Sequence, residues 1–233
     1  MRILAFETSA KAASVALLED GVLLAESYQN AGLTHSVTIL SMAENLMKTS
    51  GVGAEDVDAV AVAMGPGSFT GVRIGVAAAK GFAWGRELPL YGVSTLESMA
   101  LGYGAESGLV CPVMDARRSQ VYNALFRAEG GKLIRLREDR AISLEELAQE
   151  LKNWDGPVIF VGDGANLCYN TIGIHEERFR LAPEHRRHQR ASGVALAAEA
   201  AIARGESGDG AALQPNYLRL SQAERERLER LSK

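Results

Sequence analysis

The 233-residue sequence predicts an α/β protein made of two tandem βββαβα units that face each other across a cleft. Three observations predict this fold: the same order of elements occurs twice, a carboxylate follows the first strand of each unit, and glycines follow the fourth strand of each. A duplicated unit of this kind forms a mixed sheet with helices on its faces. Strand ends and glycine-rich turns would then line the cleft, where α/β proteins usually bind ligands.

The first unit begins with three short strands, and Asp20-Gly21 forms the tight turn between the second and the third. A helix follows and ends at Gly51. The next run is almost entirely Val and Ala, which is typical of a buried strand, and a second helix then ends at Gly85. The predicted elements are strands at 2–7, 13–18 and 22–26, a helix at 34–48, a strand at 57–64 and a helix at 70–84.

The second unit repeats this order. Its first helix opens with a capping box formed by Ser143 and Glu146, and Gly162 and Gly164 follow its fourth strand. Glycines and a serine interrupt the pattern near 101–107, so we expect a first domain at 1–103 and a second domain with a C-terminal tail at 104–233. The predicted elements are strands at 109–114, 120–127 and 133–136, a helix at 143–153, a strand at 157–161 and a helix at 192–204.

Composition excludes several classes of protein. A formal net charge of −4 argues against a general basic surface for nucleic acid. The two cysteines, Cys111 and Cys168, lack metal-binding spacing, and a disulfide framework is not expected, which fits a reducing compartment. The apolar run at the N-terminus is too short for a signal peptide, and no segment has the ~20 apolar residues that span a bilayer. We therefore expect a cytoplasmic protein with no membrane association.

The most specific stretch of the sequence is the glycine-rich turn 65–75, which reads GPGSFTGVRIG. Such a turn can present backbone N–H groups at a helix N-terminus, where they bind an anion. It is not a P-loop, because no Lys-Ser or Lys-Thr pair follows the second glycine, and its glycine spacing does not fit a Rossmann fingerprint. A plain strand-to-helix turn that needs small residues remains the alternative.

Together with this turn, four other segments resemble the TsaB (YeaZ) family in the same order over nearly the whole chain: ILAFETS at 3–9, GVSTL at 92–96, MDAR at 114–117 and PNYLR at 215–219. The resemblance implies an actin-like ATPase (ASKHA) fold and a role in attaching a threonylcarbamoyl group to the tRNA adenosine beside the anticodon. It also implies a TsaD-type transferase as partner, a TsaE-type ATPase and tRNA reached through that complex, and a homodimer when the chain is alone.

Catalysis is not expected of this chain. The resemblance implies that the TsaD transferases bind a metal through two histidines four residues apart on a helix, a spacing that places both on one face. Here His35 is present, but position i+4 is Ile39. We therefore expect no metal ligand and no catalytic residue, and a subunit that activates the transferase.

Nucleotide handling also departs from the active pattern. Actin-like kinases carry Asp-x-Gly and then Thr or Ser after the first strand, whereas this chain has Glu7-Thr8-Ser9. Glu7 and Asp115 would still face each other, as carboxylates do around Mg²⁺, or they are leftover polar groups of a shallow groove. We expect no bound cofactor beyond weak ATP or ADP, with Mg²⁺, at the interface of the complex. The candidate cleft residues are Glu7, Ser9, Gly65, Gly67, Ser68 and Asp115.

Two enzymatic alternatives stay open. One is an actin-like small-molecule kinase that acts on a sugar or a carboxylate. The other is a glycoprotease-like peptidase, which would need metal ligands or a base near Ser68; the ligands are missing, and no Gly-x-Ser-x-Gly elbow is present.

The two helices of the first unit predict a surface for a partner. The helix at 34–48 is apolar over more than half of its circumference, and the next helix carries only Arg73 and Lys80 as charges. One sheet buries a stripe of roughly 100° on a helix, so the excess needs a second cover. That cover is either the neighbouring helix or another protein, which small residues would allow to approach closely. The candidate interface residues are Val37, Leu40, Met47, Arg73, Gly75, Ala79 and Phe82.

Two features near the C-terminus complete the expectations. The basic run 185–190 predicts a solvated helix start rather than an RNA-binding patch. A capped terminal helix is expected at 221–233.

Overall fold

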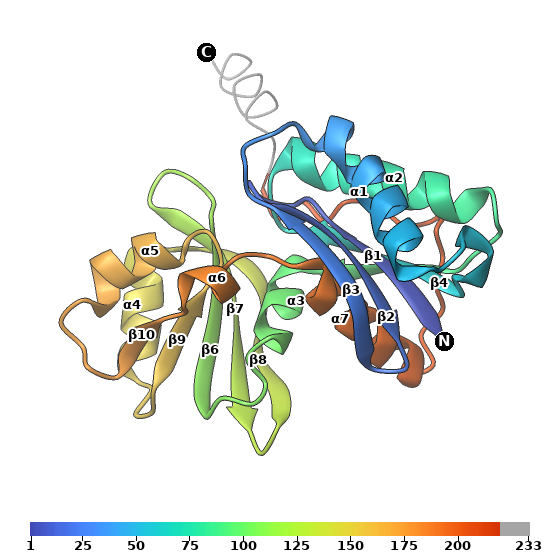
Figure 1. Ribbon diagram of the computed structural model, residues 1–233. Coiled ribbons are helices and arrows are strands. Elements are labelled where there is room, and N and C mark those ends of the chain that lie inside the picture. The colour runs from blue at the N-terminus through green and yellow to red at the C-terminus, as the bar shows by residue number, and fades with distance from the viewer. Residues whose placement is uncertain (220–233) are drawn as a thin grey trace, which may run out of the picture.

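The computed structural model describes residues 1–219 and shows two lobes, each built on a five-stranded mixed sheet (Figure 1). The expected helix at 221–233 lies outside the described residues. The first lobe contains β1 (Arg2–Glu7), β2 (Ala13–Glu19), β3 (Val22–Gln29), α1 (His35–Ser50), the short 3-10 helix η1 (Ala54–Asp56), β4 (Ala59–Gly65), α2 (Phe69–Trp84) and β5 (Leu90–Ser94). No helix among residues 1–219 has the length and the apolar character that crossing a membrane requires.

The second lobe follows α3 (Thr95–Leu101). It contains β6 (Gly108–Asp115), β7 (Gln120–Glu129), β8 (Lys132–Ser143), α4 (Leu144–Lys152), β9 (Val158–Val161), α5 (Ala165–Cys168), the π-helix η2 (Tyr169–Gly173), β10 (Phe179–Leu181) and α6 (Glu184–Arg187), and the chain then enters α7 (Ala191–Ala203).

The two sheets have the same topology. The strand order is β3-β2-β1-β4-β5 in the first lobe and β8-β7-β6-β9-β10 in the second. In each, the first strand pairs antiparallel with the second and parallel with the fourth. Glu7 therefore ends β1 just as Asp115 ends β6, which confirms the prediction that these carboxylates lie at matching strand ends.

The repeat is longer than the predicted βββαβα unit. Each sheet gains a fifth strand, β5 or β10, and each unit ends in a further helix. The helix after β9 is the four-residue α5, so α5 is the counterpart of α2, and α7 is the counterpart of α3. The prediction that the helix at 192–204 matches the helix at 70–84 is therefore wrong. A helix as short as α5 leaves too weak a periodicity to be recognised in the sequence.

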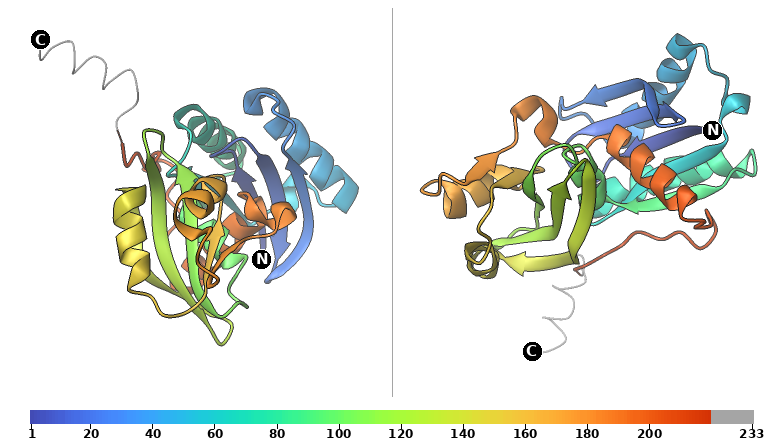
Figure 2. Two further views of the ribbon diagram at one scale, coloured as in Figure 1. Left: turned by 90° about the vertical axis from the view of Figure 1, so that its left-hand side faces the viewer. Right: turned by 90° about the horizontal axis from the view of Figure 1, so that it is seen from below.

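Five layers result from this arrangement (Figures 1 and 2). α1 and α2 cover the outer face of the first sheet, and α4 and α5 cover the outer face of the second. α3 and α7 lie between the two sheets, where α3 packs mainly against the second sheet and α7 across the first. The Ala-rich surface of α7 fits this position, because small side chains let a helix approach a sheet closely.

The predicted boundary near residue 103 separates the two sheets, but not all of the chain after it belongs to the second lobe. α7 packs on the first sheet, and its N-terminus is tied to β3 by Glu26, which accepts hydrogen bonds from the Ser192 N–H (3.0 Å) and hydroxyl (2.9 Å). After α7 the chain runs back along the first lobe, so that Leu213 joins the core under α2. The first lobe is thus completed by residues 191–219.

The basic run 185–190 has structural roles. Arg187 is buried and donates to the Ala182 carbonyl (2.8 Å) and to Asn166 (3.0 Å), and Arg190 forms an ion pair with Glu26 (2.9 Å). The expectation of a solvated helix start is therefore wrong for Arg187, because its guanidinium group satisfies buried acceptors.

Candidate functional site: the cleft between the lobes

A cleft of about 570 Å³ lies between the lobes. Four of the six candidate cleft residues line it, namely Ser9, Gly67, Ser68 and Asp115. Glu7 and Gly65 are buried beside it. The remaining polar and aromatic lining is Lys11, Phe69, Arg117, Tyr122, Asp163, Tyr217 and Arg219.

Glu7 is fully buried at the end of β1. Its Oε1 accepts a hydrogen bond from the Ser9 N–H at 2.5 Å, whereas its Oε2 has no partner among the described residues. Burial raises the pKa of Glu7 from its ordinary value of 4.5 to about 7, because the charged form loses its hydration. The hydrogen bonds from Ser9 oppose this shift in pKa, and the nearby Asp163 adds to it.

The second lobe contributes two carboxylates to the cleft. Asp115 accepts a hydrogen bond from the Arg117 N–H (2.7 Å) and lies 3.6 Å from the Arg117 guanidinium. Asp163 accepts from the buried amide of Gln189 (3.0 Å), and although Asp163 reaches the cleft surface, loss of hydration raises its pKa. Asp163 was missed at the sequence level. A signal was present, because it lies between Gly162 and Gly164, where the first unit has its own glycine turn.

These carboxylates do not form a metal centre as they stand. Within residues 1–219, no three His, Cys, Asp or Glu side chains come together in a way that could hold a metal ion. Asp115 is bound to the turn that follows it, and Glu7 lies below the surface.

The glycine turn packs tightly instead of leaving its groups open. A Cβ at Gly67 would lie 2.5 Å from the Ser9 carbonyl oxygen, and one at Gly71 would lie 2.1 Å from the Thr8 carbonyl oxygen. At Gly75 it would lie 2.4 Å from the Thr8 hydroxyl. Real Cβ atoms do not approach other atoms so closely, so only glycine lets α2 lie against residues 7–9.

Two N–H groups of this turn have acceptors within the chain. The Ser68 N–H donates to the Ser9 carbonyl at 2.6 Å, and the Ser68 hydroxyl accepts from the Gly71 N–H at 3.2 Å as the N-cap of α2. Gly65, at φ +114°, lies where a Cβ would meet the Asn216 carbonyl oxygen at 2.6 Å. The glycines of this turn therefore allow close packing of α2 and the C-terminal segment against the end of the first sheet.

His35 begins α1 and points back to the loop after β1. Its Nε2 donates to the Ala10 carbonyl at 2.7 Å, which places the proton on that nitrogen. Ile39, one turn later, is a core residue with 1% exposure. His35 thus holds the loop that bears Lys11 at the edge of the cleft.

The candidate interface residues divide into two groups. Val37 and Leu40 of α1 are 74% and 55% exposed, and Arg73 of α2 is exposed as well. Met47 and Phe82 are half-buried and pack against the core cluster of α1 and α2. These five side chains lie on the outer surface of the layer formed by α1 and α2, which we call the α1–α2 face.

The other group faces inward. Ala79 is fully buried in the core under α2, and Gly75 contacts Thr8 of the same chain. The expectation that Gly75 and Ala79 contact a partner is therefore wrong: small residues mark where α2 approaches its own sheet. Trp84, 83% exposed at the end of α2, was missed, because an apolar helix does not show from sequence which of its sides faces outward.

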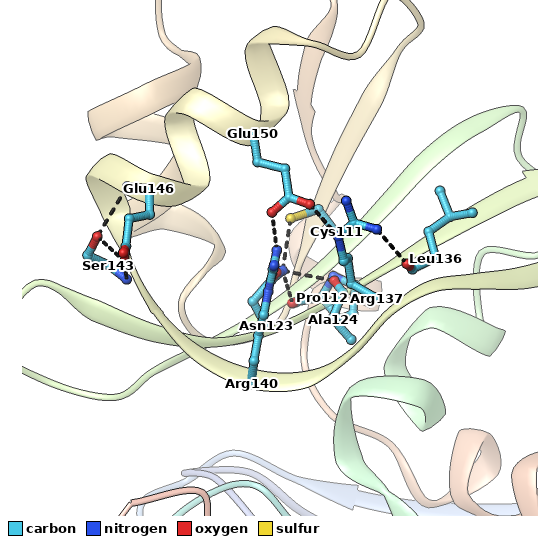
Figure 3. Close-up of polar contacts among 10 residues, drawn as sticks. All are labelled: Cys111, Pro112, Asn123, Ala124, Leu136, Arg137, Arg140, Ser143, Glu146 and Glu150. Carbon is cyan, nitrogen blue, oxygen red and sulfur yellow. Dashed lines mark hydrogen bonds and ion pairs between the residues drawn. The ribbon is translucent and has the colours of Figure 1, made fainter.

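A polar cluster stiffens the second lobe away from the cleft (Figure 3). The buried Asn123 donates to the carbonyls of Pro112 (3.2 Å) and Ala124 (2.8 Å), and its oxygen accepts from Arg140 (3.1 Å). Arg140 in turn pairs with Glu150 of α4. These contacts bind β7 and β8 to α4, so the cluster supports the sheet rather than forming a site.

Comparisons with known proteins agree with this structure. The family described as tRNA N6-adenosine threonylcarbamoyltransferase matches residues 29–227. The chain is 34% identical over 225 residues, 96% of each chain, to the tRNA threonylcarbamoyladenosine biosynthesis protein TsaB of Bacillus subtilis. YeaZ from Pseudomonas aeruginosa superposes with a TM-score of 0.78 at 29% identity, over 93% of this chain and 99% of that one.

A more distant structure shows the fold alone. Component A of the (R)-2-hydroxyglutaryl-CoA dehydratase of Acidaminococcus fermentans superposes with a TM-score of 0.51 at 13% identity, over 87% of this chain and 99% of that one. The duplicated lobes are those of the actin-like ATPase fold, as predicted. By its sequence and its structure, the chain belongs to the TsaB (YeaZ) family, within the wider family of tRNA N6-adenosine threonylcarbamoyltransferases.

Proposed function

We propose that this chain is a non-catalytic subunit in the threonylcarbamoyladenosine modification of tRNA, and that it activates a TsaD-type transferase bound to its α1–α2 face. The names of its relatives support the pathway. The observation that carries the partner role is the α1–α2 face, where the large apolar side chains Val37, Leu40 and Trp84 are mostly exposed. Val37 and Leu40 lie three residues apart on α1 and so form an exposed apolar pair, and apolar surface of this kind marks protein–protein contacts.

The identity of the partner is supported by the shared family. The transferase family matches most of this chain, so a transferase of that family has an equivalent pair of helices to offer. Two such layers can pack as a four-helix contact. In the absence of the transferase, the same face would pair with a second copy of the chain, giving a homodimer. On this proposal, a TsaE-type ATPase and the tRNA are reached through the complex.

Two features of the first lobe support a non-catalytic role. Ile39 occupies a core position where a second histidine would be needed, and the glycines beside the cleft pack tightly against residues 8 and 9. For the cofactor, the proposal is that ATP or ADP, with Mg²⁺, binds only weakly and at the interface of the complex. A kinase or a peptidase would instead require turnover by the isolated chain, so we expect none with ATP and hexoses, with ATP and carboxylates, or with peptides.

Leu40→Arg tests the partner role. It places an uncompensated charge in the proposed contact, and we expect co-purification with the organism's TsaD-type transferase to fall at least tenfold, because burying an unpaired charge is costly. The level of modified tRNA should fall in cells that depend on the variant. The matched control is Ile174→Arg, since Ile174 lies in the second lobe and is also 55% exposed.

The melting temperature of both isolated variants should stay near that of the wild type, because both side chains are on the surface. Wild-type binding by the Leu40→Arg variant, or equal loss in the Ile174→Arg control, would refute the assigned face.

A further inference from the structure

The last described segment, Leu213–Arg219, lies against the first lobe. Leu213 is 9% exposed in the core under α2, and its side chain packs where a Cβ on Gly92 would lie. The Asn216 N–H donates to the Met64 carbonyl at 2.7 Å, at the end of β4. This segment is thus fixed to the first sheet at two points before it reaches the cleft.

Tyr217 then joins the segment to α2. Its ring stacks on Phe69, with centroids 4.8 Å apart and planes inclined by 27°. The Tyr217 hydroxyl accepts a hydrogen bond from Arg73 Nε at 2.7 Å, and the Arg73 guanidinium lies 3.9 Å from the centre of the Phe69 ring. Stacking and cation–π contact both favour this arrangement, so the three side chains hold one another in place.

Arg219 crosses to the other lobe. Its guanidinium donates to the carbonyl of Ala116, in the turn between β6 and β7, and lies 3.4 Å from the carbonyl of Arg117. Tyr217 and Arg219 both line the cleft, so this contact joins the two lobes beside it. A charged donor on a carbonyl is stronger than a neutral hydrogen bond and would be lost if the lobes moved apart.

Arg73 also borders the outer surface. A groove of about 380 Å³ separates α2 from the C-terminal segment, and its lining includes Arg73, Ala77, Lys80 and Tyr217. Ala77 is exposed on α2, so the groove continues the α1–α2 face. The hydrogen bond to Tyr217 therefore fixes the position of a cation at the edge of the surface where the partner is proposed to bind.

We propose that Leu213–Arg219 is a clasp that holds the two lobes together across the cleft, and that Arg73 couples this clasp to the α1–α2 face. The coupling rests on the proposed function. A partner that binds the face with Arg73 in place favours the closed clasp, and by reciprocity the closed clasp favours the partner. When Arg219 loses its acceptors in the second lobe, the segment that bears Tyr217 is held less firmly, so the hydrogen bond between Tyr217 and Arg73 weakens and the partner must order a less constrained arginine side chain as it binds.

The clasp is tested by distance. Spin labels on Lys48→Cys in α1 and Lys152→Cys in α4, both exposed sites, report the separation of the lobes, while the native cysteines are buried. Excess unlabelled chain ensures that only distances within one chain are measured. Arg219→Ala should widen the distance distribution, whereas Arg118→Ala, an exposed arginine in the same turn, should leave it unchanged.

The coupling is tested by the affinity for the TsaD-type transferase. Arg219→Ala should weaken binding by about fivefold, at the low end of allosteric effects. Tyr217→Phe keeps the stacked ring but removes the hydrogen bond with Arg73, so in that background Arg219→Ala should change the affinity by less than about twofold.

Each outcome decides one point. A distance distribution as narrow in Arg219→Ala as in the wild type overturns the clasp. Equal losses of affinity in both backgrounds overturn the coupling. If the wild-type chain fails to bind the transferase, the proposed function and the coupling both fall, while the distance measurement on the chain alone still decides the clasp.

Discussion

The buried carboxyl of Glu7 makes the stability of the fold depend on pH in a specific direction. The pKa of Glu7 is raised from 4.5 to about 7, so in this window the folded state holds a proton that the unfolded state has released. The free energy of unfolding therefore falls as the pH rises from about 4.5 to about 7, and levels off above that. Between pH 5 and pH 8 this carboxyl alone lowers it by about 2.5 kcal/mol.

Glu7→Gln isolates this effect. The amide keeps the size of the carboxyl and can still accept the Ser9 N–H, but it cannot ionise. Urea unfolding at pH 5, 6, 7 and 8 should show the stability of the variant rising relative to the wild type by about 2.5 kcal/mol over this range. Any change in the free energy of unfolding that the amide causes equally at every pH cancels in this comparison. Glu44→Gln, at an exposed position of α1, controls for the removal of a carboxylate. If the difference in free energy of unfolding between the variant and the wild type stays constant with pH, the pKa of Glu7 is not raised in the folded state.

Three further predictions concern packing and burial. Gly71→Ala should destabilise the fold by about 2–3 kcal/mol in urea unfolding, because its Cβ would lie 2.1 Å from the Thr8 carbonyl oxygen. Gly81→Ala, on the open surface of the same helix, is the control and should stabilise the fold by about 0.5–1 kcal/mol. A stabilising effect of Gly71→Ala would contradict the close approach. Ala79→Arg should lower the free energy of unfolding of the isolated chain by about 4 kcal/mol or more, since it buries a charge in the core, and an unchanged melting curve would place Ala79 outside it. Burial raises the pKa of Cys168 to about 12, so a thiol reagent at pH 8 should modify it only after unfolding; rapid reaction with the native chain would show that the α5 region opens.

Most of the fold could be predicted because its longer elements carry clear patterns. The alternating or all-apolar runs, the turn at Asp20-Gly21 and the capping box at Ser143 all appear in the structure. The missed elements are short. β10 has three residues and α5 has four, and neither is long enough to show a period. Because α5 was not recognised, α7 was matched to α2 instead of to α3.

The candidate site was predictable only where a strand end defines it. Glu7 and Asp115 were placed correctly because equivalent strands end at equivalent positions. The prediction for Ala79 was wrong for a different reason. A small residue indicates that another element packs closely against the helix, but it does not indicate which element. The crossing by Arg219 joins residues 103 positions apart, and no local pattern encodes such a contact.

The place of α7 has a consequence for how the chain folds as it is synthesised. The inner face of the first sheet, with Ile3, Ala5 and Leu18 among its buried residues, is covered by a helix that begins only at Ala191. At translation rates of about 5–20 residues per second, roughly 10–40 s separate the emergence of β1 from that of its cover. During this interval the apolar inner face of the first sheet lacks its native cover. A truncation before α7 should therefore aggregate even though it retains every strand of the first sheet.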